Sequence, residues 1–422
     1  MSAAAPVAAH PHEAPLEQRL ALMTSLARDL HEAGTTAPRL EAALSGVATK
    51  LSLTAQVFSA PTVIMLSLRD VDAPAGSPAH SELLRVEPND VNLGRLRAVD
   101  DIAERLVRGE MAPLAAHAAL AETRVPQSRD WARAQTVLGF PLASAAVSGL
   151  LRAQPAEIAA ATLIGLMIGL LALAAERHPR LGENLSVVAA FLAAFGAAAF
   201  SAVVAPVAFK VVLVTSLIVL MPGLSLTLAM AELGMRHLMA GSARLAGGMV
   251  TLLELAFGAL AGSKAADVLG WGASLAPETV LSPSWLAWVA LPVAGVAFAL
   301  LFRARLSDWP AVLFAAFLAY GVSQLAALFL GAELGLFISA MVLALSANAY
   351  ARYFNRPGAL LRVPGLILLV PGSVGFRSLN FIFEKDISLG LDAAFSLIVL
   401  LAALVAGLLL GNGLLPARRL NA

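Results

Sequence analysis

Leu-Ile-Val-Leu-Met-Pro-Gly, at Leu217 to Gly223, returns 149 residues later as Leu-Ile-Leu-Leu-Val-Pro-Gly, at Leu366 to Gly372. Further glycines match at the same spacing: Gly241 with Gly390, Gly258 with Gly407, and Gly262 with Gly411. Each copy reads as an apolar helix broken by Pro-Gly, a short polar linker, and a second apolar helix. Chance similarity of apolar helices is the alternative, but the proline and four glycines share one offset. A repeated broken helix indicates a transporter built from two related halves.

The composition is that of a multi-pass membrane protein. Apolar residues make up 59% of the chain and charged residues 14%. Charge density is ordinary up to about Arg133, after which charges fall in short clusters between apolar stretches that can span a bilayer. A net charge of +1 gives no sign of a nucleic-acid partner, and the absence of cysteine excludes disulfides, thiolate metal sites and thiol nucleophiles.

The N-terminal third predicts a soluble domain. Residues 1–15, rich in Ala, Pro and His, are typical of a disordered leader. Residues 16–133 predict an α/β domain of the order helix-helix-strand-strand-strand-helix, with helices at Leu16 to Glu32 and Asn92 to Arg108. His31 and Glu32 are expected at a solvated surface. The domain shows no nucleophile motif, phosphate-binding loop or metal-ligand spacing, so we expect a regulatory or gating module.

The remainder predicts ten membrane spans in two halves, residues 134–283 and 284–422. Most Lys and Arg residues of the short loops fall on the side of the N-terminal domain, which is therefore expected to be cytoplasmic. The opposite side is not free of positive charge: Arg152, Lys264, Arg377 and Lys385 fall there. Five spans per half make the second half enter upside down. The predicted fold is a polytopic α-helical membrane protein of two inverted five-helix repeats, with an N-terminal α/β cytoplasmic domain.

Ionisable groups within spans are costly in lipid and are functional candidates. Lys210 could pair with a substrate carboxylate, or its stem could reach the outer headgroups. Glu254, near the middle of the fifth span, is the candidate for a proton-coupled carboxylate, with a structural hydrogen bond as the alternative. Arg377 could clamp a carboxylate or be an outer-surface charge. Gln324 lies before the tight turn between the seventh and eighth spans.

The two breaks supply the other candidate path residues. Backbone groups freed from helix bonding are tolerated at membrane depth only where protein or a water-filled cavity meets them. We therefore expect Pro222, Gly223, Ser225, Pro371 and Gly372 to line the substrate and ion path. The repeated glycines beyond the breaks are expected to allow close helix packing.

The chain resembles the threonine/serine exporter family, whose relatives include a two-subunit succinate exporter. The strongest match is Met221-Pro222-Gly223 followed by Gly241-Ser242-Ala243-Arg244, with His31-Glu32-Ala33-Gly34 in the soluble domain and Val370-Pro371-Gly372 in the second half. The resemblance implies a cytoplasmic N-terminal domain and ten helices as five plus five, here in fused form. It supplies no hydrolytic triad.

Three functions follow as expectations. The first is a secondary exporter of threonine/serine-class amino acids, driven by protons, in the bacterial cytoplasmic (inner) membrane. The second is an exporter or channel for dicarboxylates such as succinate, and the third is a membrane-anchored hydrolase. The absence of a phosphate-binding loop disfavours a primary pump. The expected partners are a small carboxylate-bearing metabolite, protons and the lipid bilayer, with no cofactor, metal or catalytic residue; whether the chain forms a homo-oligomer stays open.

Overall fold

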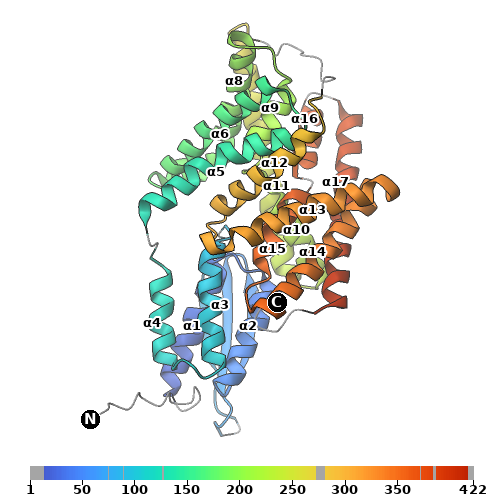
Figure 1. Ribbon diagram of the computed structural model, residues 1–422. Helices are drawn as coiled ribbons and strands as arrows, with labels where there is room; N and C mark the ends of the chain where they lie inside the picture. Colours follow the sequence, from blue (N-terminus) through green and yellow to red (C-terminus); the bar gives the residue numbers. More distant parts are fainter. Residues whose placement is uncertain are drawn as a thin grey trace, which may run out of the picture.

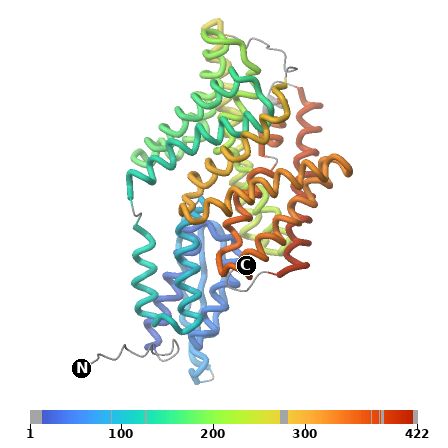
Figure 2. Tube along the Cα trace, viewed as in Figure 1, coloured from blue at the N-terminus to red at the C-terminus, as the bar shows by residue number. Residues whose placement is uncertain are grey.

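The computed structural model describes residues 14–416, except 75, 89, 126–127, 272–280, 371 and 384–385. The expected leader at residues 1–15 lies almost wholly outside the described residues. An α/β part at one end of the molecule adjoins a larger helical part (Figure 1). The green first half and the orange to red second half of the helical part lie above the blue N-terminal part (Figure 2).

The N-terminal part packs four helices with one small sheet. Its helices are α1 (Leu16–Glu32), α2 (Ala37–Lys50), α3 (Leu93–Val107) and α4 (Pro113–Thr123). Its antiparallel sheet has the order β1-β2-β3, with β1 (Leu53–Ala60), β2 (Val63–Asp70) and β3 (His80–Arg85). Apolar residues at helical spacing on α1 and α3 join alternating residues of the sheet in one buried core, which includes Leu26, Ile64 and Leu96. The Asn92 side chain accepts a hydrogen bond from Arg95 N (3.0 Å) and so caps α3.

The helical part follows the repeat seen in the sequence. The first half comprises α5 (Arg129–Leu150), α6 (Pro155–Ala175), α7 (Pro179–Glu183), α8 (Leu185–Val203), α9 (Phe209–Ser216), α10 (Gly223–Gly234) and α11 (Leu238–Val268). The second half comprises α12 (Trp285–Leu301), η2 (Leu306–Asp308), α13 (Trp309–Leu330), α14 (Ala332–Phe354), α15 (Ala359–Leu369), α16 (Gly372–Phe383) and α17 (Ile387–Leu414). Within the described chain, seven helices are long and apolar enough to cross a membrane, the joined α15–α16 segment among them. The chain is a multi-pass helical membrane protein.

The glycines that match in sequence also match in packing. A Cβ on Gly258 of α11 would lie 2.3 Å from the carbonyl oxygen of Val187 in α8. A Cβ on its counterpart Gly407 of α17 would lie 2.2 Å from the carbonyl oxygen of Phe337 in α14. Only glycine allows such close approach of two helix backbones. The expectation of close helix packing is confirmed for Gly258 and Gly407.

The first helices of the two halves, α5 and α12, run antiparallel against each other. A Cβ on Gly139, early in α5, would lie 2.7 Å from Leu301 Cδ2 at the end of α12. A Cβ on Gly149, late in α5, would lie 2.7 Å from Ala290 Cβ, early in α12. The contact order therefore reverses along the pair, so α5 and α12 point in opposite directions.

The breaks differ from the sequence expectation in one respect. The sequence predicts a short polar linker after each Pro-Gly, but Gly223 and Gly372 each begin a further short helix, α10 and α16. Helix α10 buries Leu226 and Ala229, and also Glu232. The linker prediction is wrong because α10 buries its apolar residues, and the Glu232 carboxylate is bonded to Arg244 and to Ala37 N.

Candidate functional site

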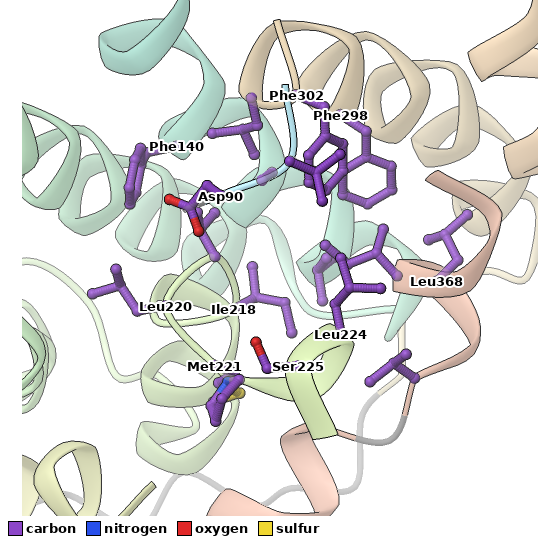
Figure 3. Close-up of a pocket in the computed structure, with 18 of the residues that line it drawn as sticks. Asp90, Phe140, Ile218, Leu220, Met221, Leu224, Ser225, Phe298, Phe302 and Leu368 are labelled. Atoms are coloured by element: carbon purple, nitrogen blue, oxygen red, sulfur yellow. The ribbon is translucent and has the colours of Figure 1, made fainter. Parts of the chain in front are cut away.

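A cavity of about 950 Å³ runs from the N-terminal domain into the helical part. Figure 3 shows apolar and aromatic side chains around it, including Phe140, Phe298 and Phe302, and the Asp90 carboxylate pointing into it. Its far end is lined by residues beside both breaks: Met221, Pro222, Ser225, Val370 and Ser373. The cavity thus joins the N-terminal α/β part to the two interrupted helices.

The two breaks cross at their glycines. A Cβ on Gly223 would lie 2.3 Å from Val370 Cγ1 and 3.1 Å from Gly372 Cα. A Cβ on Gly372 would lie 3.0 Å from Gly223 Cα. Backbone therefore touches backbone where two segments 149 residues apart meet.

The polar groups of the cavity divide by depth. Near the breaks and along the helices they are neutral: Ser225, Thr251, Tyr320, Gln324 and Ser373. The charged lining residues come from the N-terminal domain and the adjoining helix ends: Glu32, Asp90, Arg95, Glu176, Arg244 and Arg303. The cavity therefore has a charged mouth and a neutral interior.

The basic groups at the mouth differ in how tightly they are paired. Arg95 donates to Asp29 (2.7 Å) and to Glu32 (2.8 Å). Arg244 Nε donates to the buried Glu232 carboxylate (3.0 Å). Arg303 lies 3.8 Å from Glu176, and its side chain is 44% exposed, against 16% for Arg95 and 23% for Arg244. Of these three arginines, Arg303 therefore has the longest ion-pair distance and the most exposed side chain.

The N-terminal domain is bonded to both halves beside this mouth. Ala37 N, at the start of α2, donates to Glu232 Oε1 (3.2 Å) in the first half. Leu93 N, at the start of α3, donates to the carbonyl oxygen of Phe302 (2.9 Å) in the second half. The buried Asp308 accepts hydrogen bonds from Arg97 of the domain and from Arg356. These bonds hold the domain across the cavity mouth.

His31 is buried, so the expectation of a solvated surface for this residue is wrong. Its Nε2 lies 3.2 Å from the carbonyl oxygen of Pro61. Burial lowers the pKa of His31 below its usual 6.5, and the Arg244 charge lowers the pKa further, whereas hydrogen bonds that the ring donates to the backbone of Glu87 and Pro61 raise it. Glu32 faces the cavity, as part of the Arg95 pair.

The sequence-predicted path residues fall into two groups. Pro222, Ser225 and Gln324 line the cavity, while Gly223 and Gly372 form the crossing at its end. Three other predicted residues lie outside the cavity lining: Lys210, Glu254 and Arg377. Pro371 lies outside the described residues. The Lys210 ammonium lies 4.9 Å from the Phe381 ring centre of α16. Glu254 is half-buried one turn beyond Thr251, and Arg377 is exposed on α16.

Sequence reasoning missed a second repeat, and the Arg303 copy of that repeat lies at the mouth. Leu150-Leu151-Arg152-Ala153 ends α5, and Leu301-Phe302-Arg303-Ala304 ends α12, 151 residues later. Arg152 has φ 58° and Arg303 has φ 52°, the left-handed conformation that non-glycine residues seldom adopt. A search for matches at offsets near 149 would have found the pair.

Within the described residues, no cluster of three or more His, Cys, Asp or Glu side chains could hold a metal ion. The polar groups of the cavity instead suit a small soluble ligand, because they are hydroxyl, amide and charged groups spaced along an otherwise apolar wall.

Comparison with known proteins agrees with this architecture. A family model described as a threonine/serine exporter matches residues 21–265, and a second threonine/serine exporter model matches residues 287–413. An uncharacterized protein of the fission yeast Schizosaccharomyces pombe is 24% identical over 358 residues, which are 81% of this chain and 46% of the relative. The chain thus spans about half the length of that relative. No solved structure matches the chain.

Two successive family matches follow the two halves of the chain, and they point to a transporter and away from an enzyme. The chain belongs to the threonine/serine exporter family in its fused, two-half form.

Proposed function

We propose that this chain is a secondary transporter that exports small amino acids of the threonine/serine class. The observation that carries the proposal is the cavity of about 950 Å³ that leads from the soluble domain to the crossing of the two breaks. Transporters commonly form their substrate sites where discontinuous helices of two repeats meet, since freed backbone groups there can bind polar substrates.

The neutral interior favours a small zwitterion over a dicarboxylate. Ser225, Ser373 and Thr251 offer hydroxyl groups of the kind that hydrogen-bond a hydroxylated amino acid. Two carboxylates would each need a cation or several donors once removed from water. Arg95 and Arg244 already pair with carboxylates at the mouth. A dicarboxylate such as succinate is the competing outcome of the transport test.

The arrangement in the membrane follows from the same contacts. We propose ten spans as two inverted repeats in the bacterial cytoplasmic membrane, with each fourth span made of two short helices. The antiparallel contact of α5 with α12 supports the inversion. The helix ends bonded to the soluble domain are those next to the Arg-rich loops, which supports a cytoplasmic domain. Large apolar side chains such as Phe395, 71% exposed, suit contact with lipid.

Proton coupling is assigned to Glu254, the half-buried carboxylate one turn beyond the cavity residue Thr251. An ionisable group at membrane depth that can reach a water-filled path is suited to exchange protons. We expect Glu254→Gln to lose efflux driven by a pH gradient while retaining substrate exchange at equal pH. A Glu254→Gln variant that responds to a pH gradient as the parent does would leave Glu254 a structural role.

The decisive experiment is counterflow in proteoliposomes with the full-length protein. Vesicles loaded with L-threonine, L-serine, succinate or no substrate are diluted into labelled L-serine. We expect accumulation with the amino acids and none with succinate. Accumulation with succinate alone would establish the dicarboxylate function, and no accumulation with any substrate would remove the proposal.

A further inference from the structure

The Asp90 carboxylate is a charged group of the cavity wall to which the contacts described above assign no partner. Asp90 lies in the connection between β3 and α3, and its carboxylate points into the cavity (Figure 3). No hydrogen bond or ion pair joins its side chain to another described residue. The other charged lining residues of the described chain are each joined to an oppositely charged side chain.

Arg303 is placed near Asp90 by a fixed contact between the domains. Leu93 N donates to Phe302 O (2.9 Å), and Arg303 directly follows Phe302 in the chain. The next residue of the domain, Gly94, packs so closely that a Cβ there would lie 2.5 Å from Arg303 O. Asp90 is three residues before Leu93. The anionic Asp90 and the cationic Arg303 therefore both line the cavity and lie close in the chain to the contact that joins the domain to the end of α12.

The backbone of Arg303 supports a positioned role for its side chain. Its φ of 52° is a conformation that costs a non-glycine residue free energy, of the order of 1 kcal/mol. Its contact with Glu176, at 3.8 Å and between two half-exposed side chains, is of the weak surface type. A ligand carboxylate could replace Glu176 at little cost.

We infer that Asp90 and Arg303 form an entry site for an α-amino acid, in which Asp90 binds the ammonium group and Arg303 binds the carboxylate. This inference rests on the proposed function and assigns part of its substrate selection to the N-terminal domain. The domain is thus more than a gating module, because one wall of the binding cavity belongs to it. A ligand lacking either charged group satisfies only one side of the site, whereas a zwitterion satisfies both.

The test is competition binding of labelled L-serine to the full-length protein, with two analogues that each lack one charged group. Glycerate carries a hydroxyl in place of the ammonium, and ethanolamine lacks the carboxylate. Unlabelled L-serine should displace labelled L-serine from the parent protein at far lower concentration than either analogue does. Asp90→Asn should bind L-serine about tenfold or more weakly and discriminate less against glycerate, since a charge-assisted hydrogen bond is lost. Arg303→Gln should discriminate less against ethanolamine.

Matched controls come from α3 of the same domain. Asp101 and Arg105 are exposed and do not line the cavity, so Asp101→Asn and Arg105→Gln should match the parent. Unchanged discrimination in Asp90→Asn and Arg303→Gln, or an equal loss of affinity for all three ligands, would overturn the inference. Counterflow of L-serine by the parent protein distinguishes this outcome from failure of the proposed function. If the parent shows counterflow but the variants bind as described, the transport function is retained and only the entry site is disproved. If the parent shows no amino-acid counterflow, both the transport function and the entry site are disproved.

Discussion

At the residue scale, the crossing of the breaks leaves no room for a side chain. We expect Gly223→Ala to lower the transport rate at least tenfold, because its Cβ would lie 2.3 Å from Val370 Cγ1 and force the two breaks apart. Such overpacking also costs about 1–3 kcal/mol of stability. The rate is measured per amount of folded protein in proteoliposomes. Gly247→Ala is the control, since a Cβ there meets nothing within 4 Å. Transport by Gly223→Ala at the rate of the control would contradict a path at the crossing.

The buried His31 gives a pH dependence with a definite sign. Its folded-state pKa is lowered below 6.5, chiefly by burial, so the unfolded chain binds the proton more readily. The stability that neutral His31 contributes is complete above about pH 6.5 and is lost as the pH falls towards the lowered pKa. We expect the parent Tm to fall more than that of His31→Gln between pH 7.5 and pH 5 in detergent. Equal falls in both proteins would show that His31 titrates alike folded and unfolded.

Single residues also mark where sequence reasoning stops. The repeated Pro-Gly identified both breaks, because proline and glycine have local backbone consequences. The burial and pairing of Glu232 could not be predicted from the sequence, because its partners are Arg244 and Ala37 N, the latter 195 residues away in the chain. The position of Asp90 in the cavity could not be predicted either, since an acidic residue in a loop is ordinarily solvated and only the fold places this one at the cavity wall.

At the element scale, the close helix pairs of the two halves should respond alike. Gly258→Val and Gly407→Val would each drive a side chain into a facing backbone carbonyl, 2.3 Å and 2.2 Å from the Cβ position. We expect both variants to lower the Tm or the folded yield by similar amounts. Gly413→Val, in the same helix as Gly407 and with nothing within 4 Å, should leave them unchanged. A loss confined to one half would argue against equivalent packing.

Elements with regular apolar spacing were the predictable ones. The helices expected at Leu16 to Glu32 and Asn92 to Arg108 agree with α1 and α3, because periodicity and the Asn92 cap act locally. Helices α10 and α16 were missed. Each has 12 residues, too few to span a bilayer, and each follows a Pro-Gly that resembles a stop. Their helical state depends on packing against α11 and α17, which sequence periodicity does not report.

At the scale of the whole molecule, the multi-pass helical architecture and the family could be predicted, and the docking of the N-terminal domain could not. The sequence repeat is recognised from glycines that match at one offset. The docking uses backbone groups such as Leu93 N and Phe302 O, whose identity carries no sequence signal. Placement of the domain across the cavity mouth therefore emerges only in three dimensions, and the entry site that we infer depends on it.

Inversion of the two halves can be tested directly, because the chain has no cysteine of its own. A Cβ on Gly149 of α5 would lie 2.7 Å from Ala290 Cβ of α12, near the separation at which disulfides form after a small shift. We expect the double variant Gly149→Cys with Ala290→Cys to cross-link in membranes on mild oxidation. The pair Gly139→Cys with Ala290→Cys should not, since ten residues of helix separate Gly139 from Gly149 by roughly 15 Å. A cross-link in the second pair alone would mean that α5 and α12 run parallel, and the two halves would then share one orientation in the membrane.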